Sequence, residues 1–305
     1  MKKLLYIFFA LLSILGSGEL SAQEIEFSKE TFNNLDITLP YRKADIPGND
    51  SKVSLVVYLH GGSSKGDDNE IQMQEPGIDS IATWLMENNR KAIMIVPQCP
   101  ADKAWLGTMQ DVVVALIKTF IDRGAVAADR VYIFGGSMGG TGTWGMLSNH
   151  SELFAAAMPV AGNPTGMNAE AVAKVPVYTV MGTADRIMKI SNVETFLTEM
   201  DNFQAEYKLD IEEGWTHEDV CKNSYTERRL TWVFQHAKEQ TDGTNNIVKP
   251  DCKVVKTTWF TASGQKLNTI PQQKGVYIKS VVYDDGSIVS RKFHLGHHRP
   301  GDSCP

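Results

Sequence analysis

The sequence lacks an excess of positive charge and any basic run. Its 305 residues carry 30 lysines and arginines against 36 aspartates and glutamates, for a formal net charge of −6 at pH 7. Proteins that bind nucleic acid or anionic membrane surfaces do so mainly through clustered Lys and Arg. The charge balance therefore argues against nucleic acid and anionic membranes as partners.

Cysteine is scarce, and the chain holds only Cys99, Cys221, Cys252 and Cys304. Their spacing matches no zinc-binding pattern, and four cysteines allow three complete pairings, so the disulfide pairing stays open. The sequence contains no internal repeat. It implies neither a metal nor an organic cofactor.

The N-terminal apolar run, Leu4–Leu15, is shorter than the stretch of about 20 residues that a membrane-spanning helix needs. It follows two lysines and precedes a Ser-Ala pair that ends at Ala22. This layout is typical of a secretory signal peptide. We therefore expect residues 1–22 to be removed and the mature protein to be exported to the periplasm, the cell surface or the medium.

Short apolar runs alternate with amphipathic stretches between residues 51 and 238. The runs are VSLVVYLH, AIMIVPQC, RVYIFGGS, FAAAMPVAG and VPVYTVMG, and MQDVVVALIKTFIDRG places its apolar residues at helical spacing. Nearly continuous apolar runs suit strands that are buried on both faces of a sheet. The alternation predicts an α/β domain over residues 23–240, with a mainly parallel sheet flanked by helices and a last helix at Thr226–Lys238.

The character of the sequence changes after residue 240. A polar stretch rich in turn-forming residues, 241–251, is typical of a linker. Beyond it, the runs KVVKTTWF, KGVYIKSVVYDD and GSIVSRKFHL are rich in valine, threonine and aromatics and are broken by glycines. They predict a short antiparallel meander within a small β unit over residues 252–305, which ends in a flexible tail.

The stretch VYIFGGSMGGTGTW places Ser137 between a predicted strand and a predicted helix, with Gly135 and Gly139 two residues away on either side. Such a glycine-serine-glycine pattern forms a sharp strand-to-helix turn in which the serine is exposed as a nucleophile. Serine is a poor nucleophile at neutral pH. It needs a histidine to accept its proton and a carboxylate to orient that histidine.

In this arrangement the acid and then the histidine follow the serine along the chain. Asp185 comes directly after the last clear parallel strand, where side chains face the site. His217 lies on a predicted loop before the final helix, whereas His60 and His150 precede the acid. We therefore predict Asp185 and His217 as the partners of Ser137. The remaining downstream candidates are better explained as surface, helical or tail residues: Asp201, Glu206, Asp210, His236, His294, His297 and His298.

The tetrahedral intermediate of acyl transfer also needs N–H donors for its negative charge. The stretch LHGGSSKGDDN begins where an upstream strand ends, and we predict the backbone N–H groups of Gly62 and Met138 as the oxyanion hole. His60 is expected to support this loop by hydrogen bonding. The stretch is not a phosphate-binding loop because it lacks the G-K-[ST] ending. Glu70–Lys91 is predicted as a pocket wall or lid, or as an ordinary surface helix.

From Leu55 to Lys238 the sequence resembles the α/β-hydrolases of the predicted-peptidase and prolyl-oligopeptidase-like esterase group, near feruloyl and polyhydroxybutyrate-depolymerase-type esterases. The motifs YLHGGSSKGDDN, VPQCP, DRVYIFGGSMGGTGTW, SELFAAAMPVAG and GTADRIMKIS carry the resemblance together with the His217 loop. It implies Ser137, Asp185 and His217 as the catalytic triad. Two departures stand out: Gly136 replaces a residue that is often apolar, and Trp215-Thr216 precede His217 where small residues are common.

The resemblance implies a serine carboxylesterase that forms an acyl-enzyme, with small esters or acylated saccharides, such as acetyl or feruloyl esters of plant polysaccharides, as substrates. A serine peptidase of the prolyl oligopeptidase type and a non-catalytic glycan- or partner-binding protein are the alternatives. Trp105 and Trp215 are predicted to line the substrate pocket. The C-terminal β unit resembles the β-sandwich sorting domains of secreted bacterial proteins, and a stabilising β appendage is the alternative.

Overall fold

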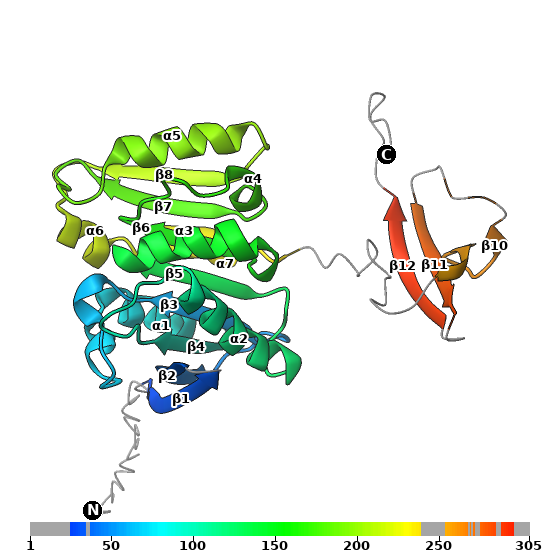
Figure 1. Cartoon of the computed structure of the whole chain (residues 1–305), viewed down its shortest axis with the longest axis horizontal. Coiled ribbons are helices and arrows are strands. Elements are labelled where there is room, and N and C mark those ends of the chain that lie inside the picture. The colour runs from blue at the N-terminus through cyan, green and yellow to red at the C-terminus, as the bar shows by residue number, and fades with distance from the viewer. Residues whose placement is uncertain are drawn as a thin grey trace, which may run out of the picture.

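The computed structural model describes residues 25–34, 37–238, 254–267, 269, 271, 275–284 and 288–295. Within them the chain forms an eight-stranded sheet flanked by helices and a second sheet of four strands (Figure 1). The predicted signal peptide and the predicted linker of residues 241–251 lie outside the described residues, so the domain boundaries remain predictions. None of the helices in the described ranges is long and apolar enough to cross a membrane.

The large sheet is mainly parallel, as predicted. Its order is β1-β2-β4-β3-β5-β6-β7-β8, in which β1 and β2 are antiparallel and the strands from β4 to β8 pair in parallel. The five runs predicted as buried strands coincide with β3 to β7, whereas β1 and β2 were not predicted. The bounds are Ser28–Asn34 for β1, Ile37–Ile46 for β2, Ser54–Leu59 for β3, Ala92–Pro97 for β4, Val131–Gly136 for β5, Ala156–Val160 for β6, Val177–Gly182 for β7 and Tyr207–Glu212 for β8.

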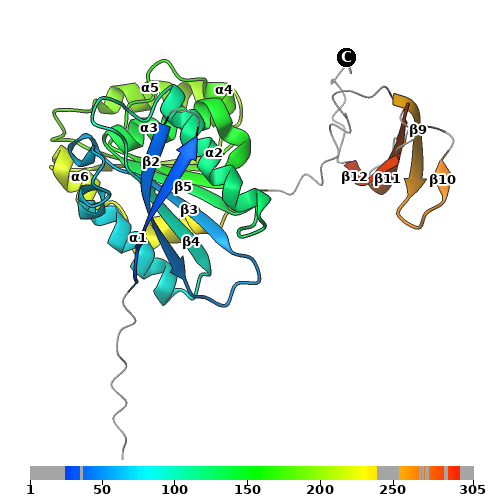
Figure 2. The ribbon, with the colours of Figure 1, turned by 60° about the horizontal axis from the view of Figure 1, so that its bottom comes forward.

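Helices cover both faces of this sheet because its central strands are apolar on both faces (Figure 2). Leu55, Val57 and Leu59 of β3 belong to one core cluster, and Val56 and Tyr58 belong to the other. The first cluster packs against α2 (Thr108–Asp122), α3 (Met138–His150), α4 (Ala169–Val172) and α5 (Ile190–Asp201). The second packs against α1 (Pro76–Glu87), α6 (His217–Asn223) and α7 (Glu227–Phe234). α7 begins one residue after the predicted start of the last helix, Thr226.

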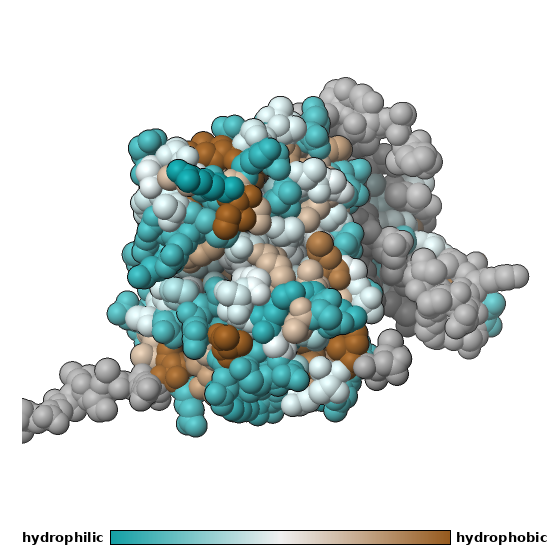
Figure 3. Space-filling view, turned by 60° about the vertical axis from the view of Figure 1, so that its left-hand side comes forward, coloured by the Kyte–Doolittle hydropathy of each residue, from teal (hydrophilic) through white to brown (hydrophobic). Residues whose placement is uncertain are grey.

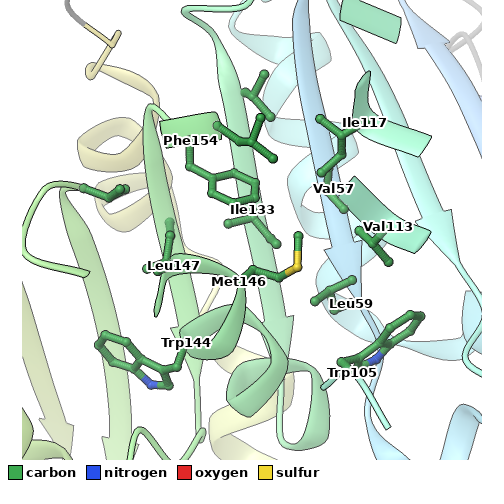
Figure 4. Close-up of a cluster of buried hydrophobic side chains, with 14 of the residues drawn as sticks. Val57, Leu59, Trp105, Val113, Ile117, Ile133, Trp144, Met146, Leu147 and Phe154 are labelled. Carbon is green, nitrogen blue, oxygen red and sulfur yellow. The ribbon is translucent and has the colours of Figure 1, made fainter. Parts of the chain in front are cut away.

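Figure 4 shows part of the first cluster. Val57 and Ile133 come from adjacent strands, and Val113 and Met146 come from α2 and α3. All four side chains are buried to at least 99%. This packing fixes α3, and therefore the turn at its start, against the centre of the sheet.

The small sheet has the order β10-β9-β11-β12, and each neighbouring pair is antiparallel. Its strands are β9 (Val254–Thr261), β10 (Lys266–Leu267), β11 (Gly275–Tyr283) and β12 (Ile288–Leu295). The three predicted runs coincide with β9, β11 and β12. Trp259 of β9 is buried, and the ammonium group of Lys279 lies 5.6 Å from the centre of its ring.

Candidate active site

Ser137 occupies a sharp turn between β5 and α3. Its backbone dihedrals, φ 58° and ψ −117°, are strained for a residue with a side chain. The neighbouring glycines make the turn possible. A Cβ atom on Gly135 would lie 2.4 Å from the carbonyl oxygen of Gly139, and one on Gly139 would lie 1.8 Å from that of Leu59. The predicted strand-to-helix turn is therefore present, and its glycines are required by close backbone contacts.

Gly136, the departure from the family pattern, lies against Cys221. A Cβ atom on Gly136 would lie 3.3 Å from the Cys221 sulfur, so the thiol occupies the space that a larger residue at this position would need. Burial raises the pKa of the Cys221 thiol to about 12. It therefore stays protonated at neutral pH and does not compete with Ser137 as a nucleophile.

A continuous chain of hydrogen bonds joins Ser137, His217 and Asp185. His217 Nε2 lies 2.8 Å from Ser137 Oγ, and His217 Nδ1 lies 2.8 Å from Asp185 Oδ2. The Asp185 side chain is fully buried, and its second oxygen accepts hydrogen bonds from the N–H groups of Ile187 and Met188 at 2.7 and 2.9 Å. Because a carboxylate only accepts hydrogen bonds, Nδ1 carries the ring proton, and Nε2 is free to accept the serine proton.

His217 is the first residue of α6, and the prediction that it lies on a loop is wrong at this point. Thr216 caps the helix: its side chain accepts from the N–H of Asp219, and the Asp219 carboxylate accepts from the N–H of Thr216. This reciprocal pair fixes the first turn of the helix and so the direction of the imidazole. The signal in the sequence was a threonine followed three residues later by an acid.

The loop that leads into α6 is tied to the loop that carries Asp185. The N–H of Ala184 donates to the Trp215 carbonyl at 3.0 Å, and the N–H of Gly214 donates to the Thr183 hydroxyl at 2.8 Å. Gly214 has φ 74°, which favours glycine. These bonds hold the imidazole and the carboxylate at a fixed separation.

A buried arginine, Arg229, holds together β8 and the segment that follows α6. The Arg229 side chain is 2% exposed; its guanidinium donates to Asp210 at 2.8 Å, to Glu212 and to the Ser224 carbonyl at 3.2 Å. Burial acts to raise the pKa of Asp210, but the hydrogen bonds from Arg229 and Arg228, together with the Arg229 charge, outweigh it and lower that pKa below its usual value. The ion pairs therefore join β8 to α7, and the hydrogen bond to Ser224 joins α7 to the connection that precedes it.

The two predicted oxyanion donors lie at the starts of helices beside Ser137. Gly62 opens the 3-10 helix η1 (Gly62–Ser64) after β3, and Met138 opens α3. The first N–H groups of a helix have no partner within that helix, so both remain available as donors. A Cβ atom on Gly62 would meet nothing within 4 Å, which leaves this side of the loop open. Their function as an oxyanion hole stays a prediction.

His60 supports this loop, as predicted. Its Nδ1–H donates to the Gly61 carbonyl at 2.7 Å, and its Nε2 accepts from the N–H of Cys99 at 2.9 Å. The side chain is fully buried, and burial lowers its pKa to about 4. A neutral imidazole therefore bridges the ends of β3 and β4.

The structure corrects the prediction that Trp105 and Trp215 line the substrate pocket. Trp105 is 1% exposed, and its indole N–H donates to the His60 carbonyl at 3.0 Å. Trp215 is half-buried against the second core cluster, with the Arg229 guanidinium 5.9 Å from its ring centre. Both rings act as packing elements of the walls behind the site.

A cavity of about 590 Å³ opens beside Ser137 and His217. On the side of the molecule nearer the carboxyl ends of the parallel strands, hydrophobic residues lie in small separate patches among hydrophilic ones (Figure 3). The predicted wall at Glu70–Lys91 splits in two. Its first part, including the 3-10 helix η2 (Ile71–Gln74), borders the cavity, and α1 packs on the sheet. The other lining residues are Gly61, Gly62, Ser63, Ser64, Glu75, Pro76, Ile187, Glu218, Cys221 and Lys222.

The described cysteines are free thiols. Cys99 is buried and Cys221 is half-buried, whereas Cys252 and Cys304 lie outside the described residues. No cluster of three or more His, Cys, Asp or Glu side chains in the described part of the chain is arranged to hold a metal ion.

Comparison with solved structures identifies the fold. A thermostable esterase aligns with a TM-score of 0.64 at 24% identity, covering 70% of this chain and 63% of its own. A feruloyl esterase module from Clostridium thermocellum, complexed with sinapinate, aligns with a TM-score of 0.57 at 17% identity, covering 71% and 90%. An acylaminoacyl peptidase from Pyrococcus horikoshii aligns with a TM-score of 0.52 at 15% identity, covering 70% and 41%. The chain therefore has the predicted α/β-hydrolase fold, and it spans less than two thirds of the thermostable esterase.

A family model adds a sequence match. Residues 103–168, which include Ser137, match the model of the prolyl oligopeptidase family. A search of curated protein sequences found no significant match. The family match and the fold agree with the resemblance drawn from the motifs.

Proposed function

We propose that this protein is a serine hydrolase that cleaves carboxylic esters. The observation that carries the proposal is the hydrogen-bonded chain from Asp185 through His217 to Ser137, at the edge of an open cavity. Only this order of groups lets one imidazole take the serine proton while a buried carboxylate stabilises the imidazolium that forms.

In the proposed reaction, Ser137 Oγ attacks the ester carbonyl while His217 Nε2 accepts its proton. The backbone N–H groups of Gly62 and Met138 stabilise the negative oxygen of the tetrahedral intermediate. The imidazolium then protonates the leaving alcohol, and an acyl-enzyme remains on Ser137. Water, deprotonated by His217, attacks the acyl-enzyme and releases the acid.

Esters of plant-polysaccharide acyl groups, acetyl or feruloyl, are the proposed substrate class. A thermostable esterase and a feruloyl esterase module share the fold, which supports an ester substrate. The exposed polar residues Ser63, Gln74 and Lys222 on the cavity wall suit a hydroxylated alcohol or saccharide. The signal-peptide pattern supports export as part of the same proposal.

A serine peptidase activity is the second candidate, because the family match and the acylaminoacyl peptidase both point to it. The same three residues would perform it, since acylation of the serine releases an amine from a peptide as it releases an alcohol from an ester. A non-catalytic binding role would leave the hydrogen-bonded chain without use.

The test is hydrolysis of p-nitrophenyl esters of increasing acyl length, methyl ferulate and peptidyl p-nitroanilides by the mature protein and by Ser137→Ala. We expect ester hydrolysis that falls at least about 10³-fold in the variant. Circular dichroism confirms that both proteins are folded. Anilide hydrolysis faster than ester hydrolysis would favour the peptidase, and equal rates for both proteins would overturn the serine mechanism.

A further inference from the structure

Glu75 lies in the same cavity as Ser137, and the mechanism above leaves it unused. Its Oε1 accepts two hydrogen bonds, from the backbone N–H of Gly61 and from the hydroxyl of Ser64, each at 2.8 Å. Gly61 and Ser64 flank Gly62. One carboxylate oxygen therefore accepts hydrogen bonds from both ends of the short loop that carries the proposed oxyanion donor.

The carboxylate has no competing structural task in the described residues. Glu75 is the N-cap residue of α1, yet its side chain makes no hydrogen bond to that helix. It also forms no ion pair within the described part of the chain, although Lys222 borders the same cavity. The side chain is instead turned towards the loop after β3.

The His60 imidazole holds the Gly61 carbonyl, but Gly62 beyond it still needs a further contact because two consecutive glycines leave the backbone free to turn. A Cβ atom added to Gly62 would meet nothing within 4 Å, so no neighbouring atoms pack against that side of the residue. A Cβ atom added to Gly61 would lie 3.2 Å from Glu75 Oε1 and 3.7 Å from the Ser137 Cβ atom. Only hydrogen bonds can therefore fix the direction of the Gly62 N–H. An oxyanion donor contributes in proportion to how well it is aimed before the reaction begins.

We infer that Glu75 is a positioning residue that holds the Gly61–Ser64 loop so that the Gly62 N–H points at the developing oxyanion. This inference rests on the proposed function. It also predicts a conflict, because the Glu75 charge lies near the negative oxygen of the intermediate and opposes it. The hydrogen-bond acceptor of Glu75 favours the reaction because it orients the loop, whereas its negative charge disfavours the negative intermediate.

Two substitutions separate the acceptor from the charge. Glu75→Gln keeps an oxygen that can accept both hydrogen bonds, so kcat is expected to stay within about threefold of wild type or to rise. Glu75→Ala removes the acceptor, and kcat is expected to fall about 10- to 100-fold with KM changed less than about threefold. Ser64→Ala removes one of the two bonds with little change in volume, and an intermediate loss in kcat is expected.

The experiment measures kcat and KM for p-nitrophenyl acetate and the rate at which a fluorophosphonate labels Ser137. Glu87→Ala, which removes an exposed carboxylate at the far end of α1, is the control and should match wild type. Thermal unfolding of each variant separates a lost fold from a misdirected loop, and Ser64→Ala keeps the test valid if Glu75→Ala does not fold.

Rescue by glutamine and loss with alanine support the inference. It is overturned if Glu75→Gln is as slow as Glu75→Ala, or if folded Glu75→Ala and Ser64→Ala both match wild type. A wild-type protein that neither hydrolyses esters nor reacts with the fluorophosphonate would instead contradict the proposed function. The two failures are therefore distinguishable.

Discussion

The two halves of the site are held in place by different physical means. On the serine side, formed by β3, β5 and the start of α3, backbone atoms pack so closely that only glycine fits at positions 135 and 139. On the histidine side, formed by β7, β8, α6 and α7, the geometry is set by a side-chain helix cap and by ion pairs between buried Arg229 and two partly exposed carboxylates. Changes on the serine side should therefore cost more stability than changes on the histidine side.

The largest effect is expected from Gly139→Ala. A Cβ atom there would lie 1.8 Å from the Leu59 carbonyl, and neither backbone segment can yield without moving the sheet or α3. We expect a loss of at least about 4 kcal/mol in the free energy of unfolding, or no folding at all, as measured by urea denaturation.

The control for this prediction is Gly62→Ala at the start of η1 on the same side of the site, where a Cβ atom meets nothing within 4 Å. Its stability should stay within about 1 kcal/mol of wild type. Equal stability of the two variants would contradict the claim that close backbone packing requires glycine at position 139.

The next effect concerns pH and His60. Its pKa is about 4 in the folded protein, below the value of 6.5 that it has when exposed. The unfolded chain therefore binds one more proton between these values, and stability falls as the pH drops from about 6.5 to 4. The shift corresponds to at most about 3 kcal/mol.

Urea denaturation of wild type and His60→Gln across this pH range measures the effect, because the difference between them removes the contribution of other groups. The variant should have the smaller slope with pH. NMR titration of the imidazole offers a second measurement, and a His60 that titrates near pH 6.5 would contradict its assigned burial.

On the histidine side, Arg229→Met should have the larger effect. It leaves the Asp210 and Glu212 carboxylates without their buried partner. Because these carboxylates are 21% and 31% exposed, we expect a loss of about 2 kcal/mol, less than for a fully buried pair. Arg228→Met is the matched control, since the Arg228 side chain is 69% exposed, and it should cost less than about 1 kcal/mol. Equal losses would show that burial of Arg229 is unimportant.

The smallest effect on stability is expected from Thr216→Ala, which removes the cap of α6. Loss of such a cap costs about 1 kcal/mol. A loss of this size leaves the protein folded and would not by itself lower kcat. Because His217 is the next residue, we expect kcat to fall several-fold in Thr216→Ala and to be restored in Thr216→Ser. An unchanged kcat in Thr216→Ala would mean that the aspartate alone orients His217.

Much of this fold could be predicted from the sequence because its central strands are apolar on both faces. The runs that became β3 to β7 are unbroken, and their alternation with amphipathic helices leaves few other architectures. β1 and β2 were missed for the opposite reason. They are half-exposed, the segment SKETFNN is largely polar, and Pro40 interrupts the pattern of β2.

The site divides in the same way. Ser137 and its glycines form a local pattern, and chain order selected the aspartate and the histidine. The positions of Trp105 and Glu75 depend on tertiary contacts instead. The Trp105 indole donates to the His60 carbonyl, 45 residues away in the sequence. The Glu75 carboxylate accepts from Gly61 and Ser64, which are 14 and 11 residues away. No local pattern reports such contacts.

The central claim is that Ser137 is an activated nucleophile, and its most direct test is reaction with a fluorophosphonate followed by mass spectrometry of the digested protein. The account predicts one adduct per chain, on the peptide that contains Ser137, and no adduct in Ser137→Ala. An adduct on another residue, or none on folded wild-type protein, would contradict it.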